Sequence, residues 1–177
     1  MQTAPRRESG LTLIETATVT AVVAVLIGTV APSFQEARTR RQLEGVAAQL
    51  ETDLQLARSE AVARFESVRV GFTRDPGGSC YVLHTGPAGG CRCDGAGTTV
   101  CGDGAEPLRT VPLGPAHPVQ LQSNSASILF DAVKGTVTPT ATLRVQSPVG
   151  ELRQVVNVMG RIRTCSPAGA VTGYRPC

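Results

Sequence analysis

The hydrophobic positions divide the chain into a continuous apolar segment, an amphipathic segment and a series of short alternating segments. Residues 11–30 are apolar or Thr except for Glu15, and residues 43–65 carry apolar side chains at steps of three and four. About 20 helical residues at ~1.5 Å each span roughly the hydrocarbon thickness of a bilayer. The second spacing is that of one face of a helix. Together the two segments predict one long helix whose first half can cross a membrane once.

Beyond residue 67 the apolar positions recur at every second residue, which is typical of strands. Clusters of Gly, Pro, Ser and Asn that favour turns separate these segments. The candidate strands are 68–72, 81–83, 107–112, 119–122, 128–130, 142–146 and 151–158, and the Gly-rich stretch 86–104 is expected to be a cross-linked loop. A helix followed by strands predicts an α+β fold in which residues 33–177 form one globular domain.

The ten N-terminal residues are polar and lack the apolar region that an ordinary secretory signal peptide carries before its cleavage site. Arg6 and Arg7 precede the apolar segment, with only Glu8 opposing their charge. The positive-inside bias keeps such an N-terminus in the cytoplasm and places the chain after Pro32 on the outer side of the membrane. The predicted domain is therefore extracytoplasmic.

Glu15 is the single charged residue of the apolar segment. An ionised carboxylate near the membrane end of an apolar helix costs about 2–3 kcal/mol. A partner cation would offset this cost, and a side chain that reaches back to the membrane interface is the alternative.

Six cysteines in an exported domain favour disulfides, because oxidising compartments preserve them and small cores benefit from them. Cys165 and Cys177 would close a C-terminal loop at a gain of about 3 kcal/mol in the chain-entropy model, so we expect this pair to be bonded. The other four cysteines, which allow three connectivities, are Cys80, Cys91, Cys93 and Cys101. Because a C-x-C ring is awkwardly tight, we expect Cys91 and Cys93 each to pair elsewhere.

Metal binding and catalysis are the competing interpretations. Four cysteines, or three with His84, could hold zinc, but their spacing lacks the C-x-x-C knuckles of structural zinc sites. Neither His84 nor His117 lies in a nucleophile motif or beside an acid–base pair. Residues 86–90 do not follow a strand and open a helix as a phosphate-binding loop would. We therefore expect no metal, no cofactor and no catalytic residue.

The string Gly10-Leu11-Thr12-Leu13-Ile14-Glu15, followed by the apolar segment and Pro32, resembles the class III signal of type IV pilins and pseudopilins. The resemblance implies that a prepilin peptidase cuts after Gly10 and that Leu11, where the family usually has Phe, becomes an N-methylated terminus. Glu15 would then pair with the terminal amine of a neighbouring subunit. Residues 1–10 would be the leader and 11–32 the membrane and filament-core segment. The protein would reside in the inner membrane with a periplasmic domain, and then in a cell-surface pilus.

The C-terminal region carries a second candidate site. With residues 157–165 as one strand, Arg161 and Arg163 lie about 6.6 Å apart on one face while Ile162 faces the core. The disulfide loop that follows could bring in Arg175 as a third cation, and guanidinium groups suit phosphates. Because the net charge is only +3, a solvated strand edge is the alternative.

Gly160-Arg161-Ile162-Arg163, followed by Cys165, is similar to the Gly-Arg-x-Arg motif of FimT-like minor pilins, in which this region binds DNA for uptake in natural transformation. The whole chain resembles the FimT/GspH branch, whose type IV pilin-like fold packs a long N-terminal helix on antiparallel β-sheets. The resemblance implies double-stranded DNA as the partner of Gly160, Arg161, Arg163 and Arg175, and other pilins as assembly partners. The alternatives are a GspH-like minor pseudopilin of a type II secretion system and a purely structural subunit that initiates a pilus.

Overall fold

The computed structural model describes residues 12–177, with the side chains of 29–32 excepted. Gly10 and Leu11, the predicted cleavage and methylation positions, lie outside the described residues. The chain forms two compact units, Met1–Ala37 and Arg38–Cys177. The described part holds one long helix, then the strands, then a short 3-10 helix, η1 (Pro167–Gly169).

Helix α1 comprises Leu13–Arg64 and is, among the described residues, the one helix long and apolar enough to cross a membrane. In the part of α1 that belongs to the first unit, up to Ala37, the described side chains are exposed. The hydroxyl of Thr16 donates to the carbonyl of Leu13 at 2.8 Å. Such internal bonds satisfy hydroxyl groups without help from water, which a membrane-spanning helix requires. Glu15 lies in the first turn and its N–H donates to the carbonyl of Thr12 at 3.1 Å.

The second half of α1 buries one apolar stripe, as its spacing predicts. The fully buried positions of the stripe are Leu43, Ala47, Leu50, Leu54, Ala57 and Ala61. Phe65 was expected to extend this stripe, and that expectation is wrong. It follows the last helical residue with a φ of 53° and is 83% exposed, because the left-handed backbone turns its side chain away from the stripe.

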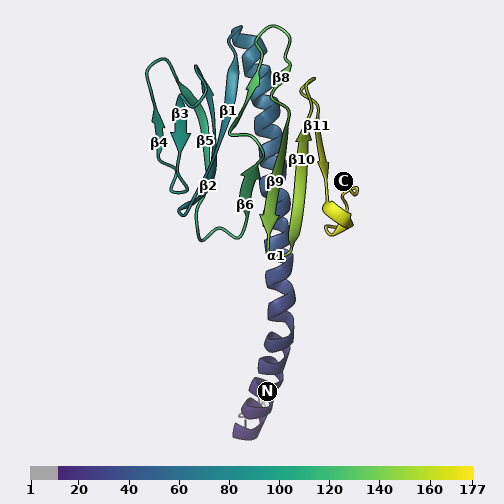
Figure 1. Ribbon diagram of the computed structural model, residues 1–177. Coiled ribbons are helices and arrows are strands. Elements are labelled where there is room, and N and C mark those ends of the chain that lie inside the picture. The colour runs from purple at the N-terminus through teal and green to yellow at the C-terminus, as the bar shows by residue number, and fades with distance from the viewer. Residues whose placement is uncertain (1–11) are drawn as a thin grey trace, which may run out of the picture. The chain divides into compact units, whose positions relative to one another are not determined.

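Two antiparallel sheets follow the helix (Figure 1). The first has the order β5-β2-β1-β7-β8, with β1 (Val68–Asp75), β2 (Gly78–Thr85), β5 (Pro107–Leu113), β7 (Ser127–Phe130) and β8 (Val137–Thr138). The second has the order β11-β10-β9-β6, with β6 (Gln120–Ser123), β9 (Ala141–Ser147), β10 (Gly150–Val156) and β11 (Ile162–Cys165). A small hairpin consists of β3 (Cys91–Cys93) and β4 (Thr99–Cys101). The predicted α+β arrangement is confirmed.

Both sheets contribute their inner faces to a single core. Val70 and Phe130 of the first sheet and Leu143 and Leu152 of the second belong to the same buried cluster as the stripe of α1. Full burial of each such side chain contributes roughly 1.5–3 kcal/mol. The helix therefore serves both sheets, and in Figure 1 its C-terminal half runs behind the strands.

A buried carboxylate ties the helix to two strands. The hydroxyl of Tyr81 on β2 donates to Oδ2 of Asp53 on α1 at 2.7 Å, and Nη1 of Arg109 on β5 lies 3.1 Å from Oδ1. Burial, reinforced by the bond to Asp53, raises the pKa of the Tyr81 hydroxyl far above its ordinary value. Asp53 therefore has a hydrogen-bond donor in the core and a partly exposed counter-ion at its edge.

Two sequence-based expectations about local structure are wrong. The stretch 86–104 is cross-linked as expected but is not wholly a loop, because residues 91–93 pair with residues 99–101 as the β3–β4 hairpin, which Cys91–Cys101 closes and Cys80–Cys93 ties to β2. Residues 157–165 are not one strand either. Asn157–Gly160 form a turn, and β11 begins only at Ile162.

We expect Tyr81→Phe to lower the free energy of unfolding by about 1–3 kcal/mol, because it leaves one oxygen of buried Asp53 without its donor. Urea denaturation that shows a lower midpoint and an unchanged slope would measure this loss. Tyr174→Phe is the matched control, since the Tyr174 hydroxyl has no hydrogen bond among the described residues, and it should change stability by less than about 0.5 kcal/mol. Equal midpoints for wild type and Tyr81→Phe would contradict this role of the contact.

Candidate nucleic-acid interface

The four-stranded sheet separates apolar and basic side chains by the alternation of its strands. On β10, Leu152 and Val156 are buried toward α1, while Arg153 and Val155 point to the outer face. Gln154 is buried on the inner face, and its Nε2 donates to the carbonyl of Ala47 at 2.5 Å. Because this contact fixes which side of β10 meets the helix, the outer face of the sheet stays free.

Strand register gathers arginines on this outer face. Arg144 of β9 is directly opposite Arg153 of β10, and Val155 of β10 is directly opposite Arg163 of β11. Residues directly opposite each other in a sheet point to the same side. Arg144 and Arg153 were not predicted as site residues. Their outward positions follow from the alternation, but only the pairing of distant strands reveals that they neighbour the C-terminal arginines.

The turn between β10 and β11 fixes the position of the Arg161 backbone. The N–H of Arg161 donates to Oδ1 of Asn157 at 2.9 Å, and the N–H of Asn157 donates to the Arg161 carbonyl at 3.1 Å. Gly160 is buried beneath the turn with a φ of 71°, and a Cβ there would lie 3.1 Å from the carbonyl oxygen of Gly135. The expectation that Gly160 belongs to the DNA-binding site stays a prediction. The structural role of Gly160 is to let the chain turn closely over Gly135.

Arg161 and Arg163 are both exposed, and Ile162 between them packs against the core, as the alternation predicts. Together with Arg175 they line a concave surface of about 560 Å³ that also includes Val155 and Thr164. Among the described residues, none of the three arginines forms a salt bridge. Their N–H donors are therefore available to a ligand.

The C-terminal disulfide brings Arg175 to this surface. Cys165 and Cys177 are bonded, which is the pairing that their spacing predicts. The N–H of Ser166 donates to the carbonyl of Arg175 at 2.9 Å, and the N–H of Cys177 donates to the carbonyl of Ser166 at 3.2 Å. These bonds dock the tail beside the end of β11.

The remaining cysteines form the bonds Cys80–Cys93 and Cys91–Cys101. Cys91 and Cys93 thus pair with other partners rather than with each other, as expected. Since no free cysteine is present, no thiolate is available as a zinc ligand.

One acidic residue shares the face. Nε of Arg153 lies 2.5 Å from Oε1 of Glu151, and Nε2 of Gln146 donates to Oε2 at 2.9 Å. Burial alone would raise the pKa of Glu151, but these two hydrogen bonds, with the charges of Arg153 and Arg144, outweigh it and hold the pKa below its ordinary value. Glu151 therefore neutralises Arg153 and leaves the other arginines uncompensated.

We define the arginine face as Arg144, Arg153, Arg161, Arg163 and Arg175. With Glu151 counted, it carries an excess of four positive charges, whereas the whole chain carries only +3. The positive charge is thus concentrated on one sheet face and one disulfide loop. Such a surface attracts polyanions at long range and offers planar donors to phosphate oxygens at contact.

Comparisons with known proteins agree with this architecture. Residues 46–160 match the family model described as Type II transport protein GspH, a match that stops just before Arg161. The crystal structure of the type IV minor pilin FimU of Pseudomonas aeruginosa is similar at 22% identity and a TM-score of 0.53, covering 76% of this chain and 96% of that one. The minor pseudopilin EpsH of the Vibrio cholerae Type 2 Secretion System is similar at 15% identity and a TM-score of 0.46, covering 70% and 96%.

A search of curated protein sequences found no match. The family model nevertheless spans more than half of the chain, including the second half of α1 and both sheets up to the β10–β11 turn. FimU shares the long helix packed on antiparallel sheets. The chain therefore belongs to the GspH/FimT family of type IV minor pilins and pseudopilins and has their pilin-like fold.

Proposed function

We propose that this minor pilin binds double-stranded DNA through the arginine face, without sequence preference, for uptake in natural transformation. The observation that carries the proposal is the convergence of Arg161, Arg163 and Arg175 on one concave surface with no acidic partner. Guanidinium groups donate two parallel hydrogen bonds to phosphate oxygens, and Arg144 extends the row of donors across the sheet.

The shape of the surface favours contacts to the DNA backbone. The arginines project from a sheet face and a loop, and among the described residues the one helix of this loop, η1 (Pro167–Gly169), is too short to fill the major groove. Phosphate contacts position a protein on DNA but do not read its sequence. With about four contacts, affinity for one copy is low and falls steeply with salt. Several subunits on one filament would bind the same duplex more tightly than one.

We further propose that the precursor is cut after Gly10 by a prepilin peptidase, that Leu11 is then N-methylated, and that Glu15 pairs with the terminal amine of a neighbouring subunit. Helix α1 would hold the protein in the inner membrane with its domain in the periplasm before assembly into a cell-surface pilus. The apolar run of α1 and family membership support this route, because pilins interact with other pilins in a filament.

A second candidate function is that of a GspH-like minor pseudopilin in a type II secretion system, or of a purely structural subunit that initiates a pilus. The description of the matching family favours the first of these. Neither role needs an arginine face, so DNA binding by these arginines separates the candidates.

We expect Arg161→Gln combined with Arg163→Gln to weaken DNA binding about tenfold or more, because each lost charge-assisted contact contributes on the order of 1 kcal/mol. The measurement is fluorescence anisotropy of a short labelled duplex titrated with the oxidised full-length protein in neutral detergent micelles. The slope of log affinity against log salt should fall by about two, at roughly 0.9 per lost phosphate contact.

The control for this pair removes the same charge from the helix side of the domain. Arg41 and Arg64 are exposed on α1, so Arg41→Gln combined with Arg64→Gln should leave the salt slope unchanged. Wild-type affinity in the Arg161 and Arg163 double variant would overturn the proposed site. Equal losses in both double variants would reduce the interaction to a general charge effect.

Arg144→Gln tests whether DNA also contacts the middle of the sheet. Arg144 is exposed and forms no salt bridge among the described residues, so we expect its loss to lower the salt slope by about one without changing stability. Arg41→Gln carries the same change in charge and should leave the slope at its wild-type value. An unchanged slope in Arg144→Gln would confine the contact to the turn and the C-terminal loop.

Gly10→Val tests the proposed precursor. A branched side chain before the cleaved bond should block the peptidase, so the full-length precursor should accumulate in membranes and be seen by intact-mass spectrometry. Gly45→Ala serves as the control, because a Cβ at Gly45 meets no other atom within 4 Å, and its processing should be normal. Normal cleavage of Gly10→Val would contradict the pilin-type leader.

A further inference from the structure

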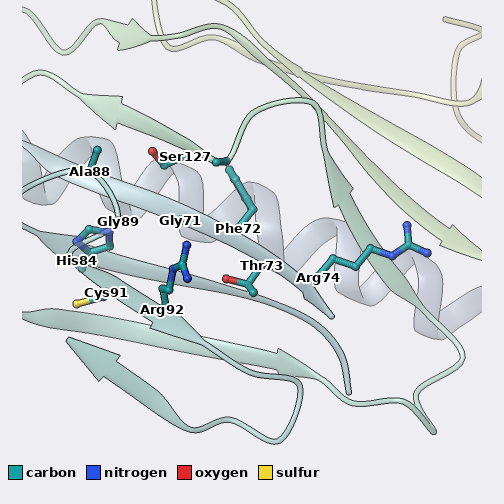
Figure 2. Close-up of a pocket in the computed structure, with 11 residues that line it drawn as sticks. Gly71, Phe72, Thr73, Arg74, His84, Ala88, Gly89, Cys91, Arg92 and Ser127 are labelled. Atoms are coloured by element: carbon teal, nitrogen blue, oxygen red, sulfur yellow. The ribbon is translucent and has the colours of Figure 1, made fainter. Parts of the chain in front are cut away.

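The outer face of the five-stranded sheet carries a pocket of about 520 Å³, separate from the arginine face. Its lining comes from β1, β2, β3, the start of β7 and the loop at Ala88 and Gly89 (Figure 2). The β3–β4 hairpin forms one wall, because Cys80–Cys93 and Cys91–Cys101 fix it over β2. Disulfide bonds therefore hold this wall of the pocket in place.

Gly71 keeps the floor of this pocket open. A Cβ at this position would lie 3.5 Å from Cγ1 of Val82, 3.7 Å from Nε2 of His84 and 3.8 Å from the carbonyl oxygen of Cys91. A side chain any larger than a methyl group would fill the space above these atoms. Glycine at this strand position leaves room for a ligand to approach the backbone.

His84 is the most buried polar group in the lining, with 0% of its surface exposed. Its Nδ1 lies 2.9 Å from the carbonyl oxygen of Thr85, and since a carbonyl only accepts, Nδ1 carries the hydrogen. Nε2 has no hydrogen-bond partner among the described residues and faces the space above Gly71. A buried polar atom left in this way is uncommon in folded proteins and points to a missing partner.

The charged groups around the pocket are guanidinium donors, and the hydroxyls of Thr73 and Ser127 beside them can donate or accept. Arg69 is directly opposite His84 in the sheet, its Nη1 donates to Oγ of Ser127 at 3.4 Å, and its buried Nε has no partner among the described residues. Arg92 reaches from β3 toward Gly71, and Arg74 lines the far end (Figure 2). Within residues 12–177, no Asp or Glu lines the pocket.

We propose that this pocket binds a phosphate monoester or inorganic phosphate. Guanidinium groups bind acceptor oxygens, whereas the His84 ring, with its hydrogen on Nδ1, offers a lone pair at Nε2 that needs a donor. A phosphate monoester has its second ionisation near pH 6, and inorganic phosphate keeps a proton throughout the neutral range, so either can present acceptor oxygens and a transferable proton on the same group. Sulfate, carboxylates and phosphodiesters carry no such proton at neutral pH. The site is thus distinct in chemistry from the DNA backbone, which is a diester.

The experiment is an amide NMR titration of the oxidised full-length protein in maltoside micelles, in a phosphate-free buffer at constant ionic strength. Inorganic phosphate and glycerol 3-phosphate are the probes, and sulfate, acetate and dimethyl phosphate are the comparison anions. We expect saturable shifts at Gly71, Gly89 and Arg92 with the two probes, together with a change in the His84 ring Nε2 signal. The comparison anions should bind at least about tenfold more weakly, because they leave Nε2 without a donor.

Arg92→Gln should lower the affinity for inorganic phosphate by about fivefold or more, because it removes a charged donor at the surface of the pocket without touching its buried floor. Arg41→Gln removes the same charge from the exposed side of α1 and should leave phosphate binding unchanged. The absence of saturable shifts, or equal binding of sulfate, overturns the proposal. Equal losses in the two variants overturn it as well, and none of these results bears on DNA binding by Arg161 and Arg163.

Discussion

The contact between the amphipathic half of α1 and the inner faces of both sheets is the constraint on which the other features depend. One apolar stripe, in which Ala47, Ala57 and Ala61 let the backbone of the helix approach closely, receives side chains from two sheets at once. The N–H of Leu121 on β6 donates to Oγ of Ser79 on β2 at 2.9 Å, so the sheets also adjoin each other. Because both inner faces are occupied by the helix, both outer faces remain for binding.

Polar contacts from the helix then determine which residues point outward. Tyr81 on β2, Gln154 on β10 and Thr164 on β11 each bond to α1, the last through Oε2 of Glu51 at 3.0 Å. A strand whose residues alternate cannot slip by one position without exchanging its buried and exposed sides. The bond of Thr164 to the helix therefore fixes Arg163 on the outer face. The same polar contacts to α1 that fix the register of the strands thus also fix the direction in which the arginine side chains point.

Sequence patterns predict the parts of this protein that local chemistry determines. The period of three and four residues defines the buried side of α1, and the alternation around Ile162 correctly gives the exposure of Arg161 and Arg163. The pattern of residues within one strand does not indicate which other strands it pairs with. The pairing of Arg144 with Arg153, and the nearness of His84 to Gly71, arise from strands paired across the sheet, so single stretches of sequence could not reveal the full arginine face or the pocket. The close approach of Gly160 to Gly135 could not be predicted either, because Gly135 lies far away in the sequence.

The cross-links of this domain also affect what a protease could remove from it. A cut in the exposed tip between Cys93 and Cys101 would leave the two pieces joined, because Cys91 and Cys101 are bonded across that tip. A cut between Cys165 and Cys177 would likewise leave Arg175 attached beside β11. Nicked molecules would thus keep every cationic group and the wall of the pocket. A break in the chain would therefore not by itself end the ability of this domain to bind ligands.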